Sequence, residues 1–222
     1  MALTILFRTH LTIDFPDELS RFAQRRPAPT LISLPEEEAP FGAFETALKE
    51  ANLLVAPPLE RSLLDIAERL RLHVIPFAGV NRAPLDWYRD RGVTLASSHG
   101  NAAAVAERAV ALALAAAGRV VEFDQDLRRG RWHRHQSAAQ PFDFWRSLRG
   151  AKTTILGGGA IGSECARLLR PLVGEITALR RSSQTLTPGI FDSVTENVET
   201  ACRGAQLLIA ALPLTHETRG FL

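Results

Sequence analysis

The amino-acid sequence predicts an α/β protein whose strands form parallel sheets covered by helices. Short apolar segments alternate with helical patterns through the first hundred residues, and each apolar segment contains almost no polar residue. Strands that are buried on both faces lose the alternation of apolar and polar residues, and such strands are typical of parallel sheets. A glycine cluster also follows an apolar run at residues 153–156, which predicts a nucleotide-binding turn.

Residues 1–99 predict a small doubly wound domain. The predicted strands lie at residues 3–7, 30–34, 53–56, 72–75 and 93–96, and the helical patterns at residues 16–26, 44–50, 62–70 and 86–89. Open parallel sheets bind ligands at the carboxyl ends of their strands. The loops that follow Ala56 and Pro76 are therefore the candidate ligand-binding loops of this domain.

Residues 100–150 predict one long helix and an exposed connection. The Ala-rich segment 101–121 is the predicted helix, and small side chains let it pack closely against another domain or subunit. The residues on one side of this helix are Val105, Ala109, Leu112 and Ala116. The residues from 122 onward are expected to be irregular. Their basic run favours an exposed connection over a nucleic-acid patch, because aromatic residues are nearly absent from it.

Gly157, Gly159 and Gly162 form a G-x-G-x-x-G pattern between a predicted strand and a helix predicted at residues 160–172. In this context the first glycine permits a tight turn, the second lets the backbone approach a pyrophosphate, and the third lets helix and strand pack closely. The first amides of the helix, from Ala160 and Ile161, would face the phosphate charge. Residues 151–222 thus predict a dinucleotide-binding domain.

The residues after the next predicted strand, at 174–179, favour NADP(H) over NAD(H). An NAD site usually has an acidic residue there, about 20 residues beyond the glycines, to bind the ribose 2′-hydroxyl. This chain has Arg180, Arg181 and Ser182 instead, and guanidinium and hydroxyl groups suit a 2′-phosphate.

A further buried strand is predicted at 207–213, so that its carboxyl end, at Leu212 and Pro213, lies on the same cofactor side. Thr215 and Thr218 follow it and are expected to begin another helix.

Four segments together resemble the D-isomer-specific 2-hydroxyacid dehydrogenase family, and the resemblance covers most of the chain. They are Asn101-Ala-Ala-Ala-Val-Ala-Glu107, Gly130-Arg-Trp132, Leu156–Gly162 and Leu212-Pro-Leu-Thr-His-Glu-Thr-Arg-Gly-Phe-Leu222. The first and last are more specific to the family than the glycine pattern. Residues 180–182 resemble the NADP-preferring glyoxylate and hydroxypyruvate reductases within it.

The resemblance implies a flavodoxin-like substrate domain, a partial Rossmann cofactor domain and an active site in the cleft between them. It implies an oxidoreductase that transfers hydride between NADP(H) and the C2 atom of a small 2-oxo or 2-hydroxy acid, and a homodimer packed through the long helix. The residues implied to contact the substrate are Ala56 and the backbone amides of Ala78, Gly79 and Val80. Those implied to contact the cofactor outside the glycine and arginine segments are Val105, Leu212, Pro213 and Thr218.

The resemblance places the catalytic groups beyond Leu222, so no catalytic residue is assigned here. These groups are an Arg for the substrate carboxylate, a His as general acid/base and a Glu that orients the His, and the reaction needs them because the cofactor supplies only hydride. Two hypotheses follow: part of such a dehydrogenase, or a non-catalytic nucleotide-binding or regulatory protein derived from the family. A short-chain reductase is disfavoured, because Tyr88 lacks a nearby lysine.

Composition argues against several other classes. The net charge of +2 gives no reason to expect a nucleic-acid or membrane partner. The two cysteines form no disulfide or metal framework, and His133 and His135 lack companion ligands, so no metal site is predicted. His73 lies inside a predicted strand, where we expect a hydrogen-bonded core histidine. No apolar run is long enough to span a bilayer, and we expect a cytoplasmic protein.

Overall fold

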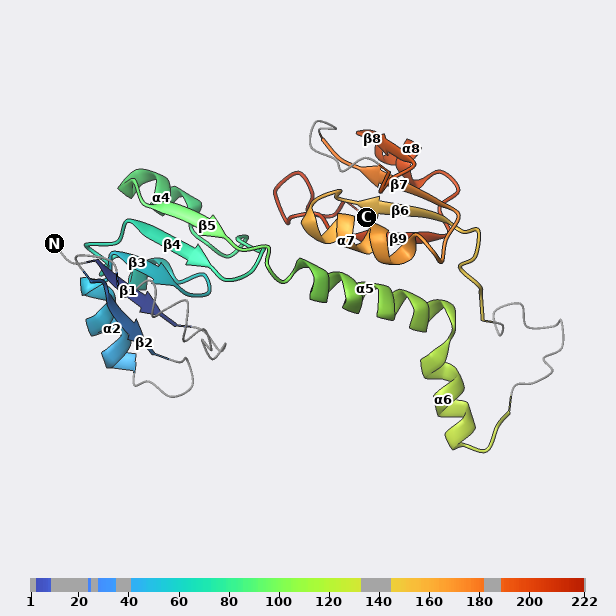
Figure 1. The fold of residues 1–222 in the computed structure, drawn as a ribbon, viewed down its shortest axis with the longest axis horizontal. Coiled ribbons are helices and arrows are strands. Elements are labelled where there is room, and N and C mark those ends of the chain that lie inside the picture. The colour runs from blue at the N-terminus through green and yellow to red at the C-terminus, as the bar shows by residue number, and fades with distance from the viewer. Residues whose placement is uncertain are drawn as a thin grey trace. The chain divides into compact units, whose positions relative to one another are not determined.

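The protein forms two compact units (Figure 1). Unit 1 comprises Met1–Gly100 and Leu214–Arg219, and unit 2 comprises Asn101–Pro213 and Gly220–Leu222. The computed structural model describes residues 3–8, 24, 28–34, 41–132, 145–181 and 189–221, so the helix predicted at 16–26 lies almost entirely outside the described residues. Among the helices that are described, none is both long enough and apolar enough to cross a membrane.

Unit 1 contains a five-stranded sheet in the order β2-β1-β3-β4-β5. All neighbouring strands in it are parallel. The strands are β1 (Thr4–Phe7), β2 (Thr30–Ser33), β3 (Leu53–Val55), β4 (Leu72–Ile75) and β5 (Thr94–Ser97). Each coincides with a predicted strand to within a residue at either end. The order 2-1-3-4-5 is that of flavodoxin-like sheets, and it confirms the predicted fold class of this unit.

The described helices of unit 1 pack on the sheet face that carries Leu6 and Leu54. They are α2 (Phe41–Glu50), α3 (Arg61–Leu64) and α4 (Leu85–Arg91), and their buried residues form one apolar cluster with these two leucines. The strand order explains why they share a face. The chain runs from β2 to β3, from β3 to β4 and from β4 to β5, and each connection advances in the same direction across the sheet. Right-handed crossovers then place the three connecting helices on the same face.

Helix α3 is shorter than the helix predicted at residues 62–70. The helix ends at Asp65, whose carboxylate accepts a hydrogen bond from Nε1 of Trp87 at 2.8 Å, and turns follow it. This tertiary contact overrides the local helical pattern. The apolar spacing still predicts burial correctly, because Leu64, Ala67 and Leu70 all lie in the core.

Unit 2 contains a four-stranded parallel sheet in the order β8-β7-β6-β9. Its strands are β6 (Lys152–Leu156), β7 (Glu175–Leu179), β8 (Ser193–Thr195) and β9 (Leu207–Ala210). Strand β8 is not predicted from the sequence, because it is a short edge strand with no apolar run. Counted from β6, the order is 3-2-1-4, as in the first four strands of a Rossmann sheet, and this confirms the predicted fold class.

Helices α5 (Ala102–Ala117) and α7 (Ala160–Leu169) pack against each other in unit 2. Ala106 and Val110 of α5 share an apolar core with Cys165 of α7, and small side chains at the contact permit a close approach. Val105 and Leu112, on the side of the helix that the sequence analysis singled out, are exposed. On the opposite sheet face, α8 (Val198–Cys202) packs on the ends of β6 and β7.

The segment 101–128 forms two helices where the sequence predicts one helix and an irregular segment. Gly118 caps α5, Arg119 adopts a left-handed conformation with φ of 50°, and α6 (Val120–Arg128) begins directly afterwards. A residue in this conformation cannot continue a right-handed helix, so the chain changes direction there (Figure 1). Helix α6 has no buried residue.

His73 of β4 is a polar residue between apolar neighbours in the unit 1 sheet. The residues that pair with it on the adjacent strands are Leu54 of β3 and Leu95 of β5. The side chain is fully buried, and this burial lowers the pKa of His73 from 6.5 to about 4. Nε2 lies 3.1 Å from the carbonyl oxygen of Ala56, and Nδ1 lies 2.7 Å from the hydroxyl of Tyr88. His73 is therefore a hydrogen-bonded core histidine, as expected.

We expect unit 1 to lose stability as the pH falls from about 6.5 to about 4. In the unfolded chain His73 takes up a proton near its ordinary pKa of 6.5, whereas the folded state resists protonation until about pH 4. The unfolded state therefore binds more protons across this window, and the loss amounts to on the order of 3 kcal/mol. Urea unfolding followed by the fluorescence of buried Trp87 measures it.

The matched variant is His73→Gln, which cannot titrate. Its deficit in unfolding free energy relative to the wild type should shrink as the pH falls, because only the wild type has a neutral histidine to lose. A deficit that stays constant from pH 7 to pH 4 would contradict the prediction.

Candidate functional site

The glycine turn joins β6 to α7 at the carboxyl end of the unit 2 sheet (Figure 1). Gly157 has φ of 101°, a conformation that residues with a side chain rarely adopt. A Cβ atom at this position would lie 2.6 Å from the carbonyl oxygen of Ala211, directly after β9. The turn therefore needs glycine both for its backbone conformation and for its close approach to the neighbouring strand.

Gly162 and Gly159 serve different purposes in this turn. A Cβ atom on Gly162 would overlap the carbonyl oxygen of Gly157, so α7 can pack against the turn only with glycine there. A Cβ atom on Gly159 would meet no atom of the described residues within 4 Å, apart from its own chain neighbours. Open space thus adjoins the N-terminus of α7, where the first helix amides are available to an anion.

The strand order places this turn at the switch point of the sheet. Strand β6 lies between β7 and β9, so the chain leaves β6 toward one edge and later returns to its other side. Open parallel sheets bind ligands at such points. The N–H of Ala211 donates to the carbonyl of Leu156 at 2.7 Å, and Leu212 and Pro213 follow directly. The segment after β9 therefore borders the glycine turn, as the sequence predicts.

Arg180 contacts the glycine turn from the adjacent strand. It follows β7, and its Nη1 atom donates a hydrogen bond to the carbonyl oxygen of Gly158 at 3.2 Å. The structure thus brings the predicted arginine and the predicted turn together. Arg181 is exposed beside it, and Ser182 lies outside the described residues.

The remaining predicted cofactor residues occupy different places. Ala160 and Ile161 form the first turn of α7 and therefore border the glycine turn. Val105 lies on α5, with its side chain 39% exposed. Thr218 belongs to unit 1, whereas the glycine turn belongs to unit 2.

Thr218 forms a reciprocal pair with Thr215. Each hydroxyl accepts a hydrogen bond from the N–H of the other residue, at 2.8 and 3.2 Å. The pair has the pattern of a helix N-cap, but residues 216–220 form turns. The helix predicted to begin here is therefore absent from the described residues.

The loop after β4 in unit 1 presents backbone amides. Within the part of the chain that the structure describes, the N–H groups of Ala78, Gly79 and Val80 donate no hydrogen bond. Gly79 is exposed, and the other two residues are half-buried. Successive unbonded amides in a loop suit carboxylate or phosphate oxygens. The loop therefore has the groups that its predicted role requires.

Ala56 lies in the core of unit 1. Its side chain is fully buried, its N–H donates to the carbonyl of Val74 at 3.2 Å, and its own carbonyl accepts from His73. Its predicted contact with the substrate stays a prediction. The half-buried Pro57 and Pro58 that follow are the accessible part of this loop.

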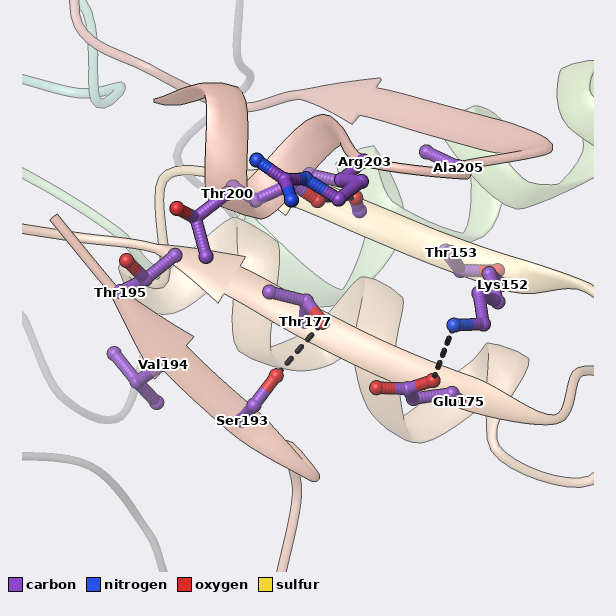
Figure 2. Close-up of a pocket in the computed structure, with 12 residues that line it drawn as sticks. Lys152, Thr153, Glu175, Thr177, Ser193, Val194, Thr195, Thr200, Arg203 and Ala205 are labelled. Carbon is purple, nitrogen blue, oxygen red and sulfur yellow. Dashed lines mark hydrogen bonds and ion pairs between the residues drawn. The ribbon is translucent and has the colours of Figure 1, made fainter. Parts of the chain in front are cut away.

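A hollow of about 460 Å³ on unit 2 is separate from the glycine turn (Figure 2). It lies over β8 and the amino-terminal parts of β6 and β7, whereas the turn follows the carboxyl end of β6. Figure 2 shows Lys152 paired with Glu175 at 3.5 Å and Thr177 bonded to Ser193 at 2.8 Å. Two pairs of its polar side chains thus bond to one another across this sheet face.

Two hydrogen bonds that hold the candidate ligand-binding loops were not predicted from the sequence. One runs from Arg180 to the carbonyl of Gly158, and the other from His73 to the carbonyl of Ala56. The sequence contains a signal only for the bond from His73, because a single histidine interrupts an otherwise apolar strand. Within the described residues no group of three His, Cys, Asp or Glu side chains is placed to hold a metal ion.

Comparison with known proteins identifies related sequences. The family model described as "D-isomer specific 2-hydroxyacid dehydrogenase, NAD binding domain" matches residues 110–222, just over half of the chain. A glyoxylate reductase from Aeropyrum pernix is 31% identical over 184 residues, which cover 79% of this chain and 55% of that protein. A glyoxylate reductase from Thermococcus litoralis is 26% identical, and the match covers 81% of this chain and 56% of that protein. The chain spans about half the length of the curated relatives it matches.

Solved structures share the fold. A protein from Pyrococcus horikoshii superposes with a TM-score of 0.73 at 24% identity, covering 98% of this chain and 64% of that chain. A glyoxylate reductase from Paecilomyes thermophila gives 0.73 at 20% identity, covering 98% and 67%. A D-lactate dehydrogenase from Aquifex aeolicus, solved with NAD and lactic acid, gives 0.70 at 20% identity, covering 96% and 62%.

The two parallel sheets, the glycine turn at a switch point and the family match agree with one another. The solved structures are similar at low sequence identity and show the fold alone. The family model, in contrast, matches the sequence over residues 110–222, which include all of the predicted dinucleotide-binding domain at 151–222. The chain therefore belongs to the D-isomer-specific 2-hydroxyacid dehydrogenase family.

Proposed function

We propose that this chain provides the substrate-binding unit and the dinucleotide-binding turn of an NADP-preferring oxidoreductase. Its substrate would be a small 2-oxo or 2-hydroxy acid of the glyoxylate or hydroxypyruvate type. The observation that carries the proposal is the glycine turn, which leaves open space beside Gly159 and has Arg180 bonded to its backbone. The glyoxylate reductases among the relatives support the substrate class.

The residues of the turn fit a dinucleotide. Gly157 and Gly162 each pack closely against backbone atoms, whereas a Cβ atom on Gly159 would meet no atom of the described residues beyond its chain neighbours. Close packing therefore explains why positions 157 and 162 are glycine, but it does not explain Gly159. The amides of Ala160 and Ile161 and the guanidinium of Arg180 supply hydrogen bonds and positive charge for phosphate oxygens.

The nicotinamide, when bound, supplies or accepts the hydride. The amides of Ala78, Gly79 and Val80 would hold the substrate carboxylate, which fixes the orientation of the acid. His73 is not the proton donor of this reaction. Burial lowers the pKa of His73 to about 4, and both of its ring nitrogens are already hydrogen-bonded.

Two alanine substitutions in the turn separate cofactor binding from folding. Gly159→Ala should lower the unfolding free energy by no more than about 1 kcal/mol, the cost of alanine at a helix N-cap, yet weaken NADPH binding by at least about tenfold. Gly162→Ala should lower the unfolding free energy by on the order of 2 kcal/mol, because its Cβ overlaps backbone. Fluorescence titration with NADPH and urea unfolding measure the two effects.

Gly42→Ala is the matched control, since a Cβ there also meets no atom within 4 Å and the residue lies in unit 1. It should leave NADPH binding unchanged and raise the unfolding free energy by up to about 1 kcal/mol, because Gly42 lies in helix α2 and alanine is the better helix former. Unaltered NADPH binding by Gly159→Ala would remove the basis for a pyrophosphate site at this turn.

Arg180→Gln tests the cofactor preference. We expect the wild type to bind NADPH more tightly than NADH, and the variant to lose roughly tenfold or more of its NADPH affinity, because a charged hydrogen-bond donor is removed. Its NADH affinity should change much less. Arg203→Gln, on an exposed arginine beside the separate hollow of unit 2, is the control that should leave both affinities unchanged. Equal binding of NADPH and NADH by the wild type would refute the preference.

We further propose a homodimer that buries helix α6. This helix has no buried residue, although it carries Val120, Val121 and Leu127, which are all more than half exposed. Trp132 follows it and is 69% exposed, and a hollow of about 390 Å³ lies between Leu127 and Trp132. Contiguous apolar side chains of this kind mark protein interfaces.

Leu127→Glu should convert the dimer to a monomer, because it places a charge in the proposed apolar interface. Leu85→Glu alters an equally exposed leucine on α4 and should leave the dimer intact. Sedimentation velocity at micromolar concentration distinguishes the two states. A monomeric wild type would rule out the proposed dimer.

A further inference from the structure

The side chain of His73 connects β4 to the loop that follows β3. These strands are neighbours, and their loops emerge side by side at the carboxyl edge of the unit 1 sheet. One loop begins at Ala56, and the other contains the unbonded amides of Ala78, Gly79 and Val80. His73 lies two residues before the end of β4 and bonds to the carbonyl of Ala56 at 3.1 Å.

The hydrogen-bond partners determine which ring nitrogen of His73 carries the proton. The carbonyl oxygen of Ala56 can only accept, so Nε2 must be the protonated nitrogen. Nδ1 is then an acceptor, and the Tyr88 hydroxyl donates to it at 2.7 Å. Tyr88 remains a donor because burial raises its pKa to about 12. The order of donation therefore runs from Tyr88 through His73 to Ala56.

Among the described residues, no backbone N–H donates to the carbonyl of Ala56, so the imidazole is its partner there. Ala56 is fully buried, and without the imidazole its carbonyl would lie in the core with no partner. Leaving a buried acceptor unbonded costs about 1–3 kcal/mol, which a shift of the loop toward water would relieve.

We propose that His73 is a positioning residue, whose Nε2–H fixes the Ala56–Pro58 turn beside the Ala78–Val80 amide loop, and that the Tyr88 hydroxyl holds the ring in place by donating to Nδ1. The inference rests on the proposed function, because it assigns the turn a part in shaping the site for a small 2-oxo acid. The link between the two residues and the turn stands on the hydrogen bonds alone.

The tautomer can be read from the ring ¹⁵N chemical shifts of His73 in the full-length, ¹⁵N-labelled chain. We expect the neutral Nε2–H tautomer in the wild type, and the same tautomer in Tyr88→Phe, because the Ala56 carbonyl that selects it is present in both. Trp87→Phe is the control. It removes the hydrogen bond to Asp65 from the same helix and should reduce stability without changing the tautomer.

Glyoxylate titration, followed by the amide signals of Gly79 and Val80, tests the consequence for the site. Tyr88→Phe removes the bond that holds the ring at Nδ1. If the ring then keeps the bonded orientation in only about a fifth of the population, the apparent dissociation constant should rise about fivefold. Trp87→Phe should bind glyoxylate as the wild type does. His73→Gln, which retains an N–H donor, should bind more tightly than His73→Leu, which leaves the Ala56 carbonyl unbonded.

The two measurements separate the possible failures. An Nδ1–H tautomer in the wild type, or equal glyoxylate affinities in His73→Gln and His73→Leu, overturns this inference and leaves the proposed function standing. A wild type that binds NADPH but no glyoxylate overturns the proposed substrate class, and with it the part assigned to His73 in substrate binding.

Discussion

The close backbone packing between the glycine turn, helix α7 and the end of β9 is the constraint on which unit 2 depends. Gly162 lets α7 approach the carbonyl of Gly157, and Gly157 lets the turn approach Ala211. Any side chain at either position would push the helix or the neighbouring strand away. Because these contacts use no side chain, the space beside Gly159 stays open. The same packing that holds the fold together therefore leaves a free helix N-terminus at the switch point of the sheet.

Unit 1 supports its loops by a different means. Its two candidate loops follow the adjacent strands β3 and β4. The described helices that come after these loops, α3 and α4, are too short to offer a strong N-terminal anion site. A buried imidazole from β4 takes the place of backbone bonding for the carbonyl of Ala56. This solution requires a neutral histidine in one orientation, which the surrounding core and Tyr88 provide. Rigid loops at the end of a parallel sheet thus arise from side-chain hydrogen bonding in one unit and from glycine packing in the other.

Most of the fold could be predicted from the sequence, because buried parallel strands are continuous apolar runs. Strands β1 to β7 and β9 were predicted in this way, whereas β8, at an exposed edge, has no such run. Helix lengths were less predictable. The α3 pattern continues to Leu70, but the bond between Asp65 and Trp87 ends the helix earlier. The break at Arg119 has no proline to mark it, and the Gly118 that precedes it was not used to divide the predicted helix.

By itself the sequence determined the two parallel sheets, the glycine turn, the arginines beside it and the family resemblance, since each depends on residues close together in the chain. Only the tertiary structure decided what each candidate residue can offer. It showed Ala56 buried with both polar groups used, Val105 on the exposed side of α5, and Arg180 bonded to Gly158. The physical reason is that availability for a ligand depends on which partners from distant segments already occupy each group, and no local pattern records those partners.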